Sequence, residues 1–540
     1  MMAYKKDFYM LINNFDNNNK KIEIFDSTLR DGAQGEGISF SIEDKLAVTK
    51  ALDYVGADYI EAGNPGSNRK DLEFFKEVDR SSLRNARLAA FGSTRRKGIK
   101  AEDDENCAAL LTAGTDVAVI FGKAWDLHVT EILKTTTEEN LNMISDTVRF
   151  LKSKGKTVIF DAEHYFDGYK RNPEYALAAL NAAAEAGADR LVLCETNGGF
   201  LPSQVGSIVA KTCAAFPDAV IGIHCHNDSG CAVANSIAAV EAGARHVQGT
   251  YLGYGERCGN ANLSTIIANL QIKLGYECVP EKNLQRFTRV ARWISEIANQ
   301  SLYGGMPYVG GSAFSHKAGM HIDAVAKLSS SFEHVSPESV GNERRFLMSE
   351  VAGRGTVLKK ISKIAPQLTK DSPEIQKICD EVKRLEYEGY SFEAAEASFE
   401  LLVRRILGQQ KEHFKLNYFK AIVDGPTNNT FSSSAIVKIT VDDRTEITAA
   451  EGDGPVHALD NALRRVLETF YPQIGEVHLT DYKVRVLDPQ KATGAKVRVL
   501  IECSDETGSW STVGVSTDVI HASWIAILES VQYKLDKSGL

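Results

Sequence analysis

The stretch VIGIHCHNDSGCAVANSIAAVEAGARHVQGT, residues 220–250, contains the pattern that decides the fold. An apolar run at 220–224 is followed by a helical stretch with three-to-four-residue apolar spacing, and a second apolar run follows at 246–250. This order repeats from residue 21 to about residue 278, which is typical of βα units. The expected strands are 22–25, 59–62, 88–91, 117–121, 157–160, 190–194, 220–224 and 246–250.

The repeated units favour a closed barrel. Helical stretches such as SIEDKLAVTKALDYVGAD and YALAALNAAAEAGAD end in Gly-Ala-Asp, a helix stop before the next strand. A doubly wound open sheet is the alternative, and it would gather its polar residues at one crevice. Here polar residues follow the strands of many different units, as expected of a barrel whose loops carry the site. We therefore predict an α/β fold with a (β/α)8 (TIM) barrel.

Two histidines close the strand expected at 220–224. Because His224 and His226 are separated by one residue on an extended strand, their side chains point to the same side, and Cys225 points to the other. This favours shared coordination of a divalent metal over packing as core histidines. Asp31, in the turn of IEIFDSTLRDGAQ, is the best candidate for a third ligand. Spacing alone leaves this residue evenly balanced between a ligand and a capping or turn carboxylate.

Further polar residues follow other expected strands. Arg30, beside Asp31, could polarise a carbonyl oxygen or form a plain salt bridge. Asp161 and Glu163 in IFDAEHYFDG suit acid or base chemistry and structural roles equally well. Thr196 in LCETNGG could hydrogen-bond a substrate carboxylate.

Four more candidates lie later in the chain. Asn260 in GYGERCGNANL could be a metal ligand, could support one, or could be a simple turn residue. Cys258, in the same run, is more consistent with a small turn residue than with a reactive thiol. His316 and His321 lie outside the expected barrel, where a surface histidine is the alternative.

Composition narrows the class of protein. A chain of 540 residues is too long for one ordinary core, so two or three domains are expected. A net charge of -9 with interspersed signs argues against a nucleic-acid surface. No apolar run approaches the roughly 20 residues that span a bilayer, and no secretory signal is recognisable. Nine cysteines without CxxC spacing suit reduced thiols and a cytoplasmic location.

The expected organisation has four parts. An N-terminal extension covers 1–20, the barrel 21–279, a helical linker subdomain 280–416 and an α+β domain 417–540. The last part contains an internal duplication, AIVKITVDDRTEITAAEGDGPVHALDNALRRVL and AKVRVLIECSDETGSWSTVGVSTDVIHASWIAILESV, in which His457 and His521 occupy equivalent places. Two copies predict a compact pseudo-twofold domain, of a kind that commonly binds partners or effectors at the seam between its repeats.

Four runs together, STLRDGAQ, HCHND, GERCGNANL and SHKAGMHIDAV, resemble the acyl-CoA-condensing, metal-dependent barrel family. That family includes the 2-isopropylmalate, homocitrate and citramalate synthases. The resemblance covers nearly the whole chain, and FGKAWDLHVTEILKTT, VGNERRFLMSEVAGR and STVGVSTDVIHASW resemble the citramalate synthase branch most. The duplicated C-terminal domain resembles the regulatory domain of the family.

The resemblance implies an acyltransferase in which acetyl-CoA loses a methyl proton and its enolate attacks the ketone of a 2-oxo acid, followed by thioester hydrolysis. It implies a divalent metal, which could be Mg, Mn or Zn, and a homodimer whose partner chain could donate His321. The implied metal ligands are Asp31, His224, His226 and Asn260. The implied substrate-binding residues are Arg30, Gln34 and Thr196, and the implied catalytic residues are Arg30, Glu163 and His321.

The leading hypothesis is condensation with pyruvate to give citramalate for isoleucine biosynthesis, with feedback by a branched-chain amino acid, isoleucine first, at the C-terminal domain. A 2-isopropylmalate synthase is the alternative, because 2-oxoisovalerate differs from pyruvate by two methyl groups, worth about 1 to 3 kcal/mol per methylene. A lyase would share the metal site without needing the duplicated domain. A catalytically weak amino-acid sensor is suggested by Phe332, where related enzymes often carry tyrosine; Tyr303 or Tyr308 could supply the missing hydroxyl.

Overall fold

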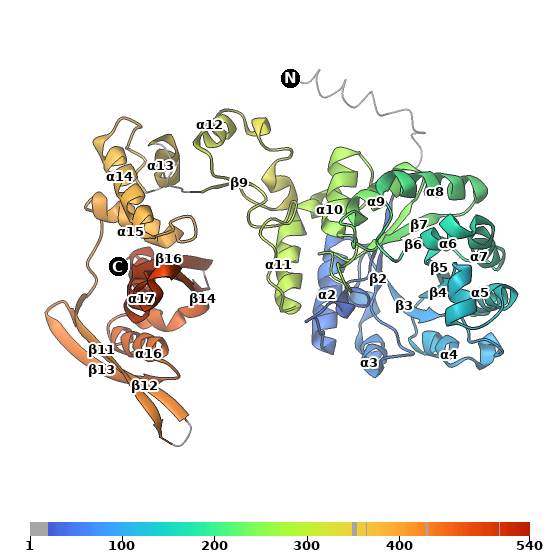
Figure 1. Cartoon of the computed structure of the whole chain (residues 1–540), viewed down its shortest axis with the longest axis horizontal. Coiled ribbons are helices and arrows are strands. Elements are labelled where there is room, and N and C mark those ends of the chain that lie inside the picture. Colours follow the sequence, from blue (N-terminus) through green and yellow to red (C-terminus); the bar gives the residue numbers. More distant parts are fainter. Residues whose placement is uncertain (1–19, 348–353, 363, 428–429, 507, 540) are drawn as a thin grey trace. The chain divides into compact units, whose positions relative to one another are not determined.

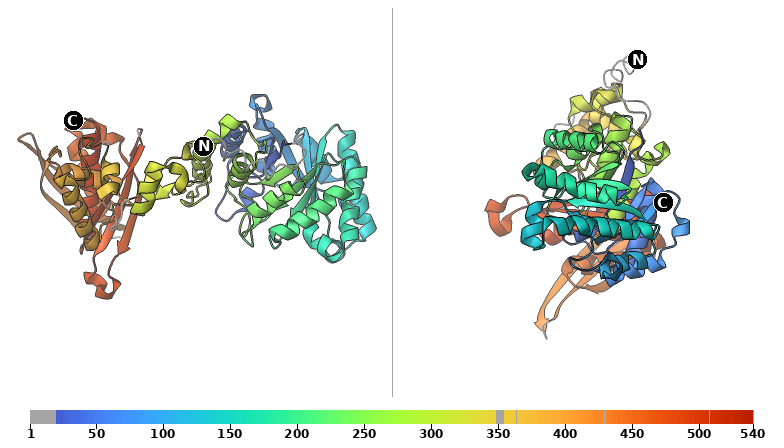
Figure 2. Two further views of the ribbon diagram at one scale, coloured as in Figure 1. Left: turned by 90° about the horizontal axis from the view of Figure 1, so that it is seen from above. Right: turned by 90° about the vertical axis from the view of Figure 1, so that its right-hand side faces the viewer.

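A computed structural model of the chain describes residues 20–347, 354–362, 364–427, 430–506 and 508–539. It divides into two compact units, Met1–Phe314 with Val335–Glu343 and Ser315–His334 with Arg344–Leu540, and each is described by itself (Figures 1 and 2). The extension predicted over 1–20 falls outside the described residues apart from Lys20, and the VGNERRFLMSEVAGR run falls partly outside them.

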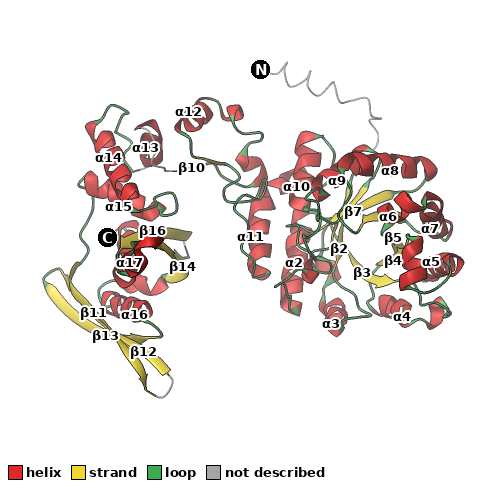
Figure 3. Ribbon diagram, viewed as in Figure 1, coloured by secondary structure: helices red, strands yellow, loops and turns green. Residues whose placement is uncertain are grey.

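In the described part of the first unit, eight parallel strands form a closed barrel in which β8 returns to pair with β1. Figure 3 shows the strands ringed by helices. Closure confirms the predicted (β/α)8 barrel and excludes the open sheet. The strands lie close to their predicted positions: β1 (Glu23–Asp26), β2 (Tyr59–Glu61), β3 (Arg87–Ser93), β4 (Val117–Lys123), β5 (Thr157–Glu163), β6 (Arg190–Glu195), β7 (Ile221–Cys225) and β8 (His246–Gly249).

The helices around the barrel follow the end signals in the sequence. Ser41 and Asp44 form a reciprocal capping box at the start of α2, and Gly56 ends that helix in the left-handed region at φ 104°. The helices are α2 (Ile42–Val55), α3 (Arg69–Glu77), α4 (Glu105–Thr112), α5 (Thr137–Ser153), α6 (Tyr165–Arg171), α7 (Pro173–Glu185), α8 (Pro202–Ala215), α9 (Ala232–Glu241), α10 (Leu263–Ala268) and α11 (Phe287–Ile297).

The barrel packs in two layers, as alternation along each strand requires. Phe25, Tyr59 and Val119 belong to the small cluster that fills the interior. Cys225 belongs to the larger cluster between strands and helices, so its side chain points away from the interior as predicted. Unusually polar side chains share the interior: His246 and Gln248 are fully buried there.

The second unit begins with a mainly helical part that has its own apolar core. Two two-residue strands, β9 (Ser315–His316) and β10 (Arg345–Phe346), pair in parallel. The helices are α12 (Gly319–Lys327), α13 (Arg354–Ile361), α14 (Pro373–Glu388) and α15 (Glu396–Ile406).

The C-terminal part confirms the predicted duplication. In the described residues each copy has three antiparallel strands and one helix. His457 and His521 both stand at the third position of their helices. The sequence analysis had not assigned the first strand of either copy. The copies are β11 (Lys415–Thr427), β12 (Thr430–Val441), β13 (Arg444–Gly452) and α16 (Pro455–Glu468), then β14 (His478–Val486), β15 (Val497–Asp505), β16 (Gly508–Ser516) and α17 (Val519–Lys537).

Among the described residues, no helix combines the length and apolar character needed to cross a membrane.

Candidate active site

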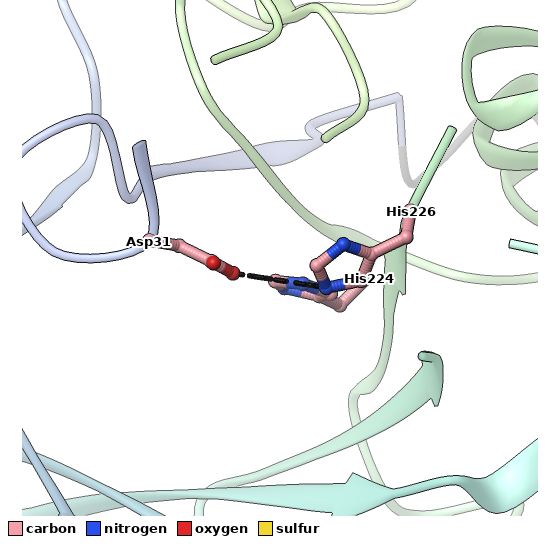
Figure 4. Close-up of side chains that lie close together, drawn as sticks. All are labelled: Asp31, His224 and His226. Carbon is pink, nitrogen blue, oxygen red and sulfur yellow. Dashed lines mark hydrogen bonds and ion pairs between the residues drawn. The ribbon is translucent and has the colours of Figure 1, made fainter. Parts of the chain in front are cut away.

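Three predicted metal ligands meet at the C-terminal end of the barrel strands. Asp31, His224 and His226 each offer a ligand atom, and these atoms all lie within 4.8 Å of one another. The Oδ2 atom of Asp31 lies 3.3 Å from Nε2 of His224 and 3.9 Å from Nε2 of His226. Figure 4 shows the carboxylate pointing toward both imidazole rings. The three side chains are buried, so they are shielded from bulk water.

Local structure explains this convergence. His224 lies on β7, and His226 follows on the same side after one intervening residue. His226 forms a β-bridge with Asn260, which brings the GNANL turn beside the pair. Asp31 sits in the turn after β1, where its backbone N–H donates to the Ser27 hydroxyl at 3.1 Å. The turn therefore aims the carboxylate at the histidines.

The donor set fits a divalent cation. The two Nε2 atoms are only 3.4 Å apart, a spacing that suits two lone pairs directed at one shared ion. The amide nitrogen of Asn260 donates to the carbonyl of Tyr254 at 3.1 Å, whereas its buried Oδ1 has no hydrogen-bond partner among the described residues. That oxygen is thus available as a fourth ligand. Mixed nitrogen and oxygen donors admit Mg, Mn and Zn alike.

Electrostatics favour the deprotonated forms of Asp31 and His226. Burial acts to raise the pKa of the Asp31 carboxyl, but Arg30 and His224 outweigh it and hold that pKa well below its usual range. Burial and the neighbouring His224 lower the pKa of His226 to about 4. An ionised carboxylate and a neutral imidazole are the forms that bind metals.

Arg30 is fixed beside this cluster. Its Nε donates to the Glu61 carboxylate at 2.6 Å, and its Nη1 lies 3.5 Å from Oδ2 of Asp31. Its guanidinium also lies 3.8 Å from the centroid of the Phe91 ring. Burial lowers the pKa of Arg30, but Glu61 and Asp31 raise it above its ordinary value, so the charge is permanent.

A pocket of about 290 Å³ opens over the cluster. Most of the site residues that were predicted in the barrel line this pocket. The loops that follow several different strands therefore converge at one place. Sequence reasoning did not identify its aromatic wall, where the rings of Phe91 and Phe121 stack with centroids 5.4 Å apart. The pocket is lined by Arg30, Asp31, Gln34, Phe91, Phe121, Asp161, Glu163, Cys194, Thr196, His224, His226, Glu256 and Arg257.

The two carboxyls of the IFDAEH run differ in environment. Glu163 forms an ion pair with Lys123, from the end of β4. Asp161 accepts a hydrogen bond from the Gln248 amide at 3.0 Å, and burial together with nearby Glu61 raises its pKa to about 7. Glu163 is therefore the more solvent-accessible of the two carboxyls.

Thr196 is placed to donate a hydrogen bond. Its Oγ1 accepts from the backbone N–H of His164 at 3.0 Å, which leaves the hydroxyl hydrogen directed elsewhere. Glu195, by contrast, accepts from the Gly199 backbone at 2.9 Å and is fully buried outside the pocket lining. Asn197 donates to Asp167 at 3.0 Å. Of these three residues, Thr196 alone lines the pocket described above.

His321 belongs to the second unit, on α12, and the barrel does not contain it. Its ring stacks on Phe332 with centroids 4.1 Å apart. Next to Phe332, the buried Glu333 accepts from Arg344 through two bonds of 2.6 Å and lies 3.1 Å from Nε2 of His316. This network anchors the segment that carries the His321 and Phe332 pair.

The remaining candidate residues, two tyrosines and a cysteine, differ in their exposure and hydrogen bonding. Tyr308 is buried and donates to Oδ1 of Asn269 at 2.8 Å, so its hydroxyl is already engaged. Tyr303 is 71% exposed. Cys258 is an exposed free thiol outside the pocket lining.

Comparisons with known proteins agree with this geometry. An HMGL-like family model matches residues 21–294, a homocitrate synthase post-HMGL domain-like model matches 308–389, and a LeuA allosteric (dimerisation) domain model matches 393–535. The (R)-citramalate synthase of Aquifex aeolicus is 51% identical over 519 residues, 96% of this chain and 98% of that protein. That of Synechocystis sp. is 49% identical over 523 residues, covering 95% and 96%.

A more distant relative is also informative. The probable 2-isopropylmalate synthase of Methanopyrus kandleri is 31% identical over 516 residues, 95% of this chain and 98% of that protein. The chain therefore belongs to the HMGL-like family of barrel enzymes, among the condensing acyltransferases that comprise the citramalate and 2-isopropylmalate synthases.

Proposed function

We propose that the enzyme condenses acetyl-CoA with pyruvate to give citramalate and free CoA. The observation that carries this proposal is the convergence of Asp31, His224 and His226 beneath a small pocket that also holds Arg30, in a chain about half identical to (R)-citramalate synthases. A base removes a methyl proton from acetyl-CoA, and a carbon–carbon bond forms to the ketone carbon. The ketone oxygen then takes up a proton, and water cleaves the thioester to release the CoA thiol.

The 2-oxo acid binds above the three side chains of Asp31, His224 and His226. Asp31, His224 and His226 would hold a divalent cation, with Oδ1 of Asn260 as a further ligand. When bound, the cation would act as a Lewis acid where negative charge develops on the former ketone oxygen. Arg30 faces the same position and stabilises that charge, and Glu61 keeps the guanidinium in place.

Other residues orient the substrate. The Thr196 hydroxyl donates to the carboxylate of the oxo acid, since its own oxygen is already occupied by the His164 N–H. Gln34 lines the pocket from the same loop as Arg30 and binds the substrate there. These contacts hold the ketone in a fixed orientation toward the attacking carbon.

Proton transfer is assigned to Glu163 and His321. Lys123 pairs with Glu163 and fixes its orientation at the rim of the pocket. His321 acts from the helical subdomain, and we assign it to the partner chain of a homodimer, an assignment supported by the match to a LeuA allosteric (dimerisation) domain model over 393–535. Phe332 supports the His321 ring by stacking and supplies no hydroxyl.

The choice of pyruvate rests on two observations. Five citramalate synthases are 45 to 51% identical to this chain, compared with 31% for the 2-isopropylmalate synthases. In addition, we place the acceptor side chain against the stacked rings of Phe91 and Phe121, which form one wall of the pocket and would limit the size of that side chain.

We assign feedback regulation of the enzyme to the duplicated C-terminal domain. We also assign the enzyme to the cytoplasm and to isoleucine biosynthesis. A cavity of about 700 Å³ lies between α16 of the first copy and β14 of the second, which is the predicted seam. Its wall combines Val456 and Leu479 with Asp460 and Arg464, so apolar and charged groups could bind the side chain and the two charges of an amino acid. Isoleucine is the first candidate for this effector.

A panel of 2-oxo acids tests the proposal. Purified protein is incubated with acetyl-CoA, Mn²⁺ and each acid, and release of CoA thiol is followed. We expect fastest release with pyruvate and inhibition by isoleucine. Fastest release with 2-oxoisovalerate would instead establish the 2-isopropylmalate reaction, and no release with any acid would favour an amino-acid sensor.

A further inference from the structure

A series of hydrogen-bonded polar groups runs from the half-buried Glu23 through the barrel interior to Asp31, His224 and His226. It starts at Glu23 on β1, passes through His246 and Gln248 on β8, and ends at His224 on β7. Register places these residues side by side, since Glu23 is opposite His246, and His224 is opposite Gln248. The interior of a barrel is normally filled by apolar side chains. A series of polar groups at this place is therefore unusual and indicates a functional role.

The direction of each hydrogen bond follows from the first group. Arg190 donates to both carboxylate oxygens of Glu23, at 2.8 and 2.6 Å. Burial acts to raise the pKa of Glu23, but the bonds from Arg190 and His246 outweigh it and lower that pKa to about 2. Glu23 is therefore an ionised carboxylate that can only accept hydrogen bonds.

His246 must then donate from Nδ1, which lies 3.1 Å from Oε2 of Glu23. Burial lowers the pKa of His246, which favours the neutral ring. A neutral imidazole with its proton on Nδ1 carries a lone pair on Nε2. That Nε2 lies 3.5 Å from the side-chain nitrogen of Gln248.

The amide of Gln248 is thereby oriented. Its nitrogen faces two acceptors, Nε2 of His246 and Oδ1 of Asp161, the latter at 3.0 Å. Its oxygen consequently faces Nδ1 of His224, at 3.0 Å. A carbonyl oxygen can only accept, so Nδ1 of His224 carries a proton, and Nε2 is the nitrogen that faces Oδ2 of Asp31, at 3.3 Å.

We infer that Gln248 is a positioning residue that fixes the His224 tautomer, so that Nε2 of His224 is preset as a metal ligand before any ion arrives. The inference rests on the proposed function, because it presumes that this cluster holds the metal. Groups that hydrogen-bond the distal nitrogen of a ligating histidine typically contribute 10- to 100-fold in metal affinity. Gln248 forms such a bond to Nδ1 of His224. The orientation of its amide is set in turn by Arg190 and Glu23, at the other end of the series of hydrogen bonds.

The test compares two substitutions of the same side chain. Gln248→Met keeps the length and volume but neither accepts nor donates, so Mn²⁺ affinity, measured by electron paramagnetic resonance of the free ion, should fall about 10- to 100-fold. Gln248→Glu retains an acceptor for the His224 proton and should stay within about threefold of the wild type, on the same scale. Equal Mn²⁺ affinity in the Met variant and the wild type would overturn the inference.

A matched control separates this effect from general loss of packing. Gln271, half-buried in the π-helical turn Asn269–Lys273, bonds backbone groups and not side chains, donating to the Val279 carbonyl at 3.0 Å. Gln271→Met should leave Mn²⁺ affinity unchanged. A loss in this control equal to that of Gln248→Met would show that packing, not the tautomer, is responsible.

A second measurement does not depend on the stability of any variant of Gln248. In metal-free wild-type protein labelled with ¹⁵N-histidine, the His224 signal, identified by its loss in His224→Gln, should report a proton on Nδ1. The absence of a proton on Nδ1 would overturn the inference. If the wild type itself binds no Mn²⁺, the proposed metal site fails, and that outcome is distinguishable because the tautomer is still measured.

Discussion

Replacing Phe121 by alanine should convert a selective pocket into a permissive one. Phe121 forms part of the pocket wall and stacks on Phe91 at 5.4 Å between centroids. Phe91 itself is less suitable for this test, since Arg30 lies 3.8 Å above its ring and would be disturbed too. Removal of the Phe121 ring enlarges the pocket where we place the acceptor side chain, and the cation over this ring is Lys123, with Nζ 5.5 Å from the centroid, and not a neighbour of Asp31.

The expected size of the effect follows from the two acceptors. They differ by two methyl groups, and a pocket distinguishes one methylene by about 1 to 3 kcal/mol, or roughly 10- to 200-fold. Phe121→Ala should therefore raise the ratio of kcat/KM for 2-oxoisovalerate over pyruvate by about 10- to 200-fold. The assay is release of CoA thiol over a range of each acid at saturating acetyl-CoA.

The control is the same change away from the pocket. Phe150, on α5, is also half-buried and packs against the outer core of the barrel. Phe150→Ala should lower stability and leave the ratio unchanged. If Phe121→Ala leaves the acceptor ratio within twofold of the wild type, the ring does not limit substrate size and the argument for pyruvate from pocket shape is refuted.

Three further predictions concern the metal and stability. His224→Ala should reduce turnover by roughly 1,000-fold with an unchanged circular dichroism spectrum, because a metal contributes several kcal/mol to transition-state stabilisation; turnover within tenfold of the wild type would contradict the assignment. Chelation with EDTA should abolish CoA release and added Mn²⁺ or Mg²⁺ should restore it, whereas full activity after exhaustive chelation would exclude a metal requirement. Burial raises the pKa of Glu529 to about 7, so the stability given by its protonated form is lost as the pH rises from about 4.5 through 7; Glu529→Gln should remove about 2 kcal/mol of this loss between pH 5.5 and 7.5, measured by urea unfolding at the two pH values, and parallel pH profiles for the two proteins would contradict the shift.

Much of the barrel could be predicted because its signals are local. Strand position follows from apolar runs, and helix ends follow from capping residues such as Ser41 and Gly56. The same holds for His224 and His226, whose spacing already requires a common side of a strand. Convergence of Asp31 on this pair followed once the barrel closed, since β1 and β7 both neighbour β8.

The aromatic wall and the series of polar groups could not be predicted in this way. Phe91 and Phe121 sit in apolar runs that look the same whether a ring faces the interior or the helices, and only the pocket distinguishes them. Gln248 carries no motif. Its importance depends on which atoms lie within 3.5 Å of its amide, and two of its three partners, His224 and Asp161, come from other strands.

The sequence by itself determined the order of strands and helices, the duplication of the C-terminal domain and the chemical types of the ligands, since each depends on periodicity and residue identity within a short stretch. Only the tertiary structure decided whether Phe91 and Phe121 face the pocket, which carboxyl of Asp161 and Glu163 is desolvated, and which nitrogen of His224 faces Gln248 and which faces Asp31. Those properties depend on contacts between strands that are distant in the chain, because burial and hydrogen-bond direction are set by neighbours in space.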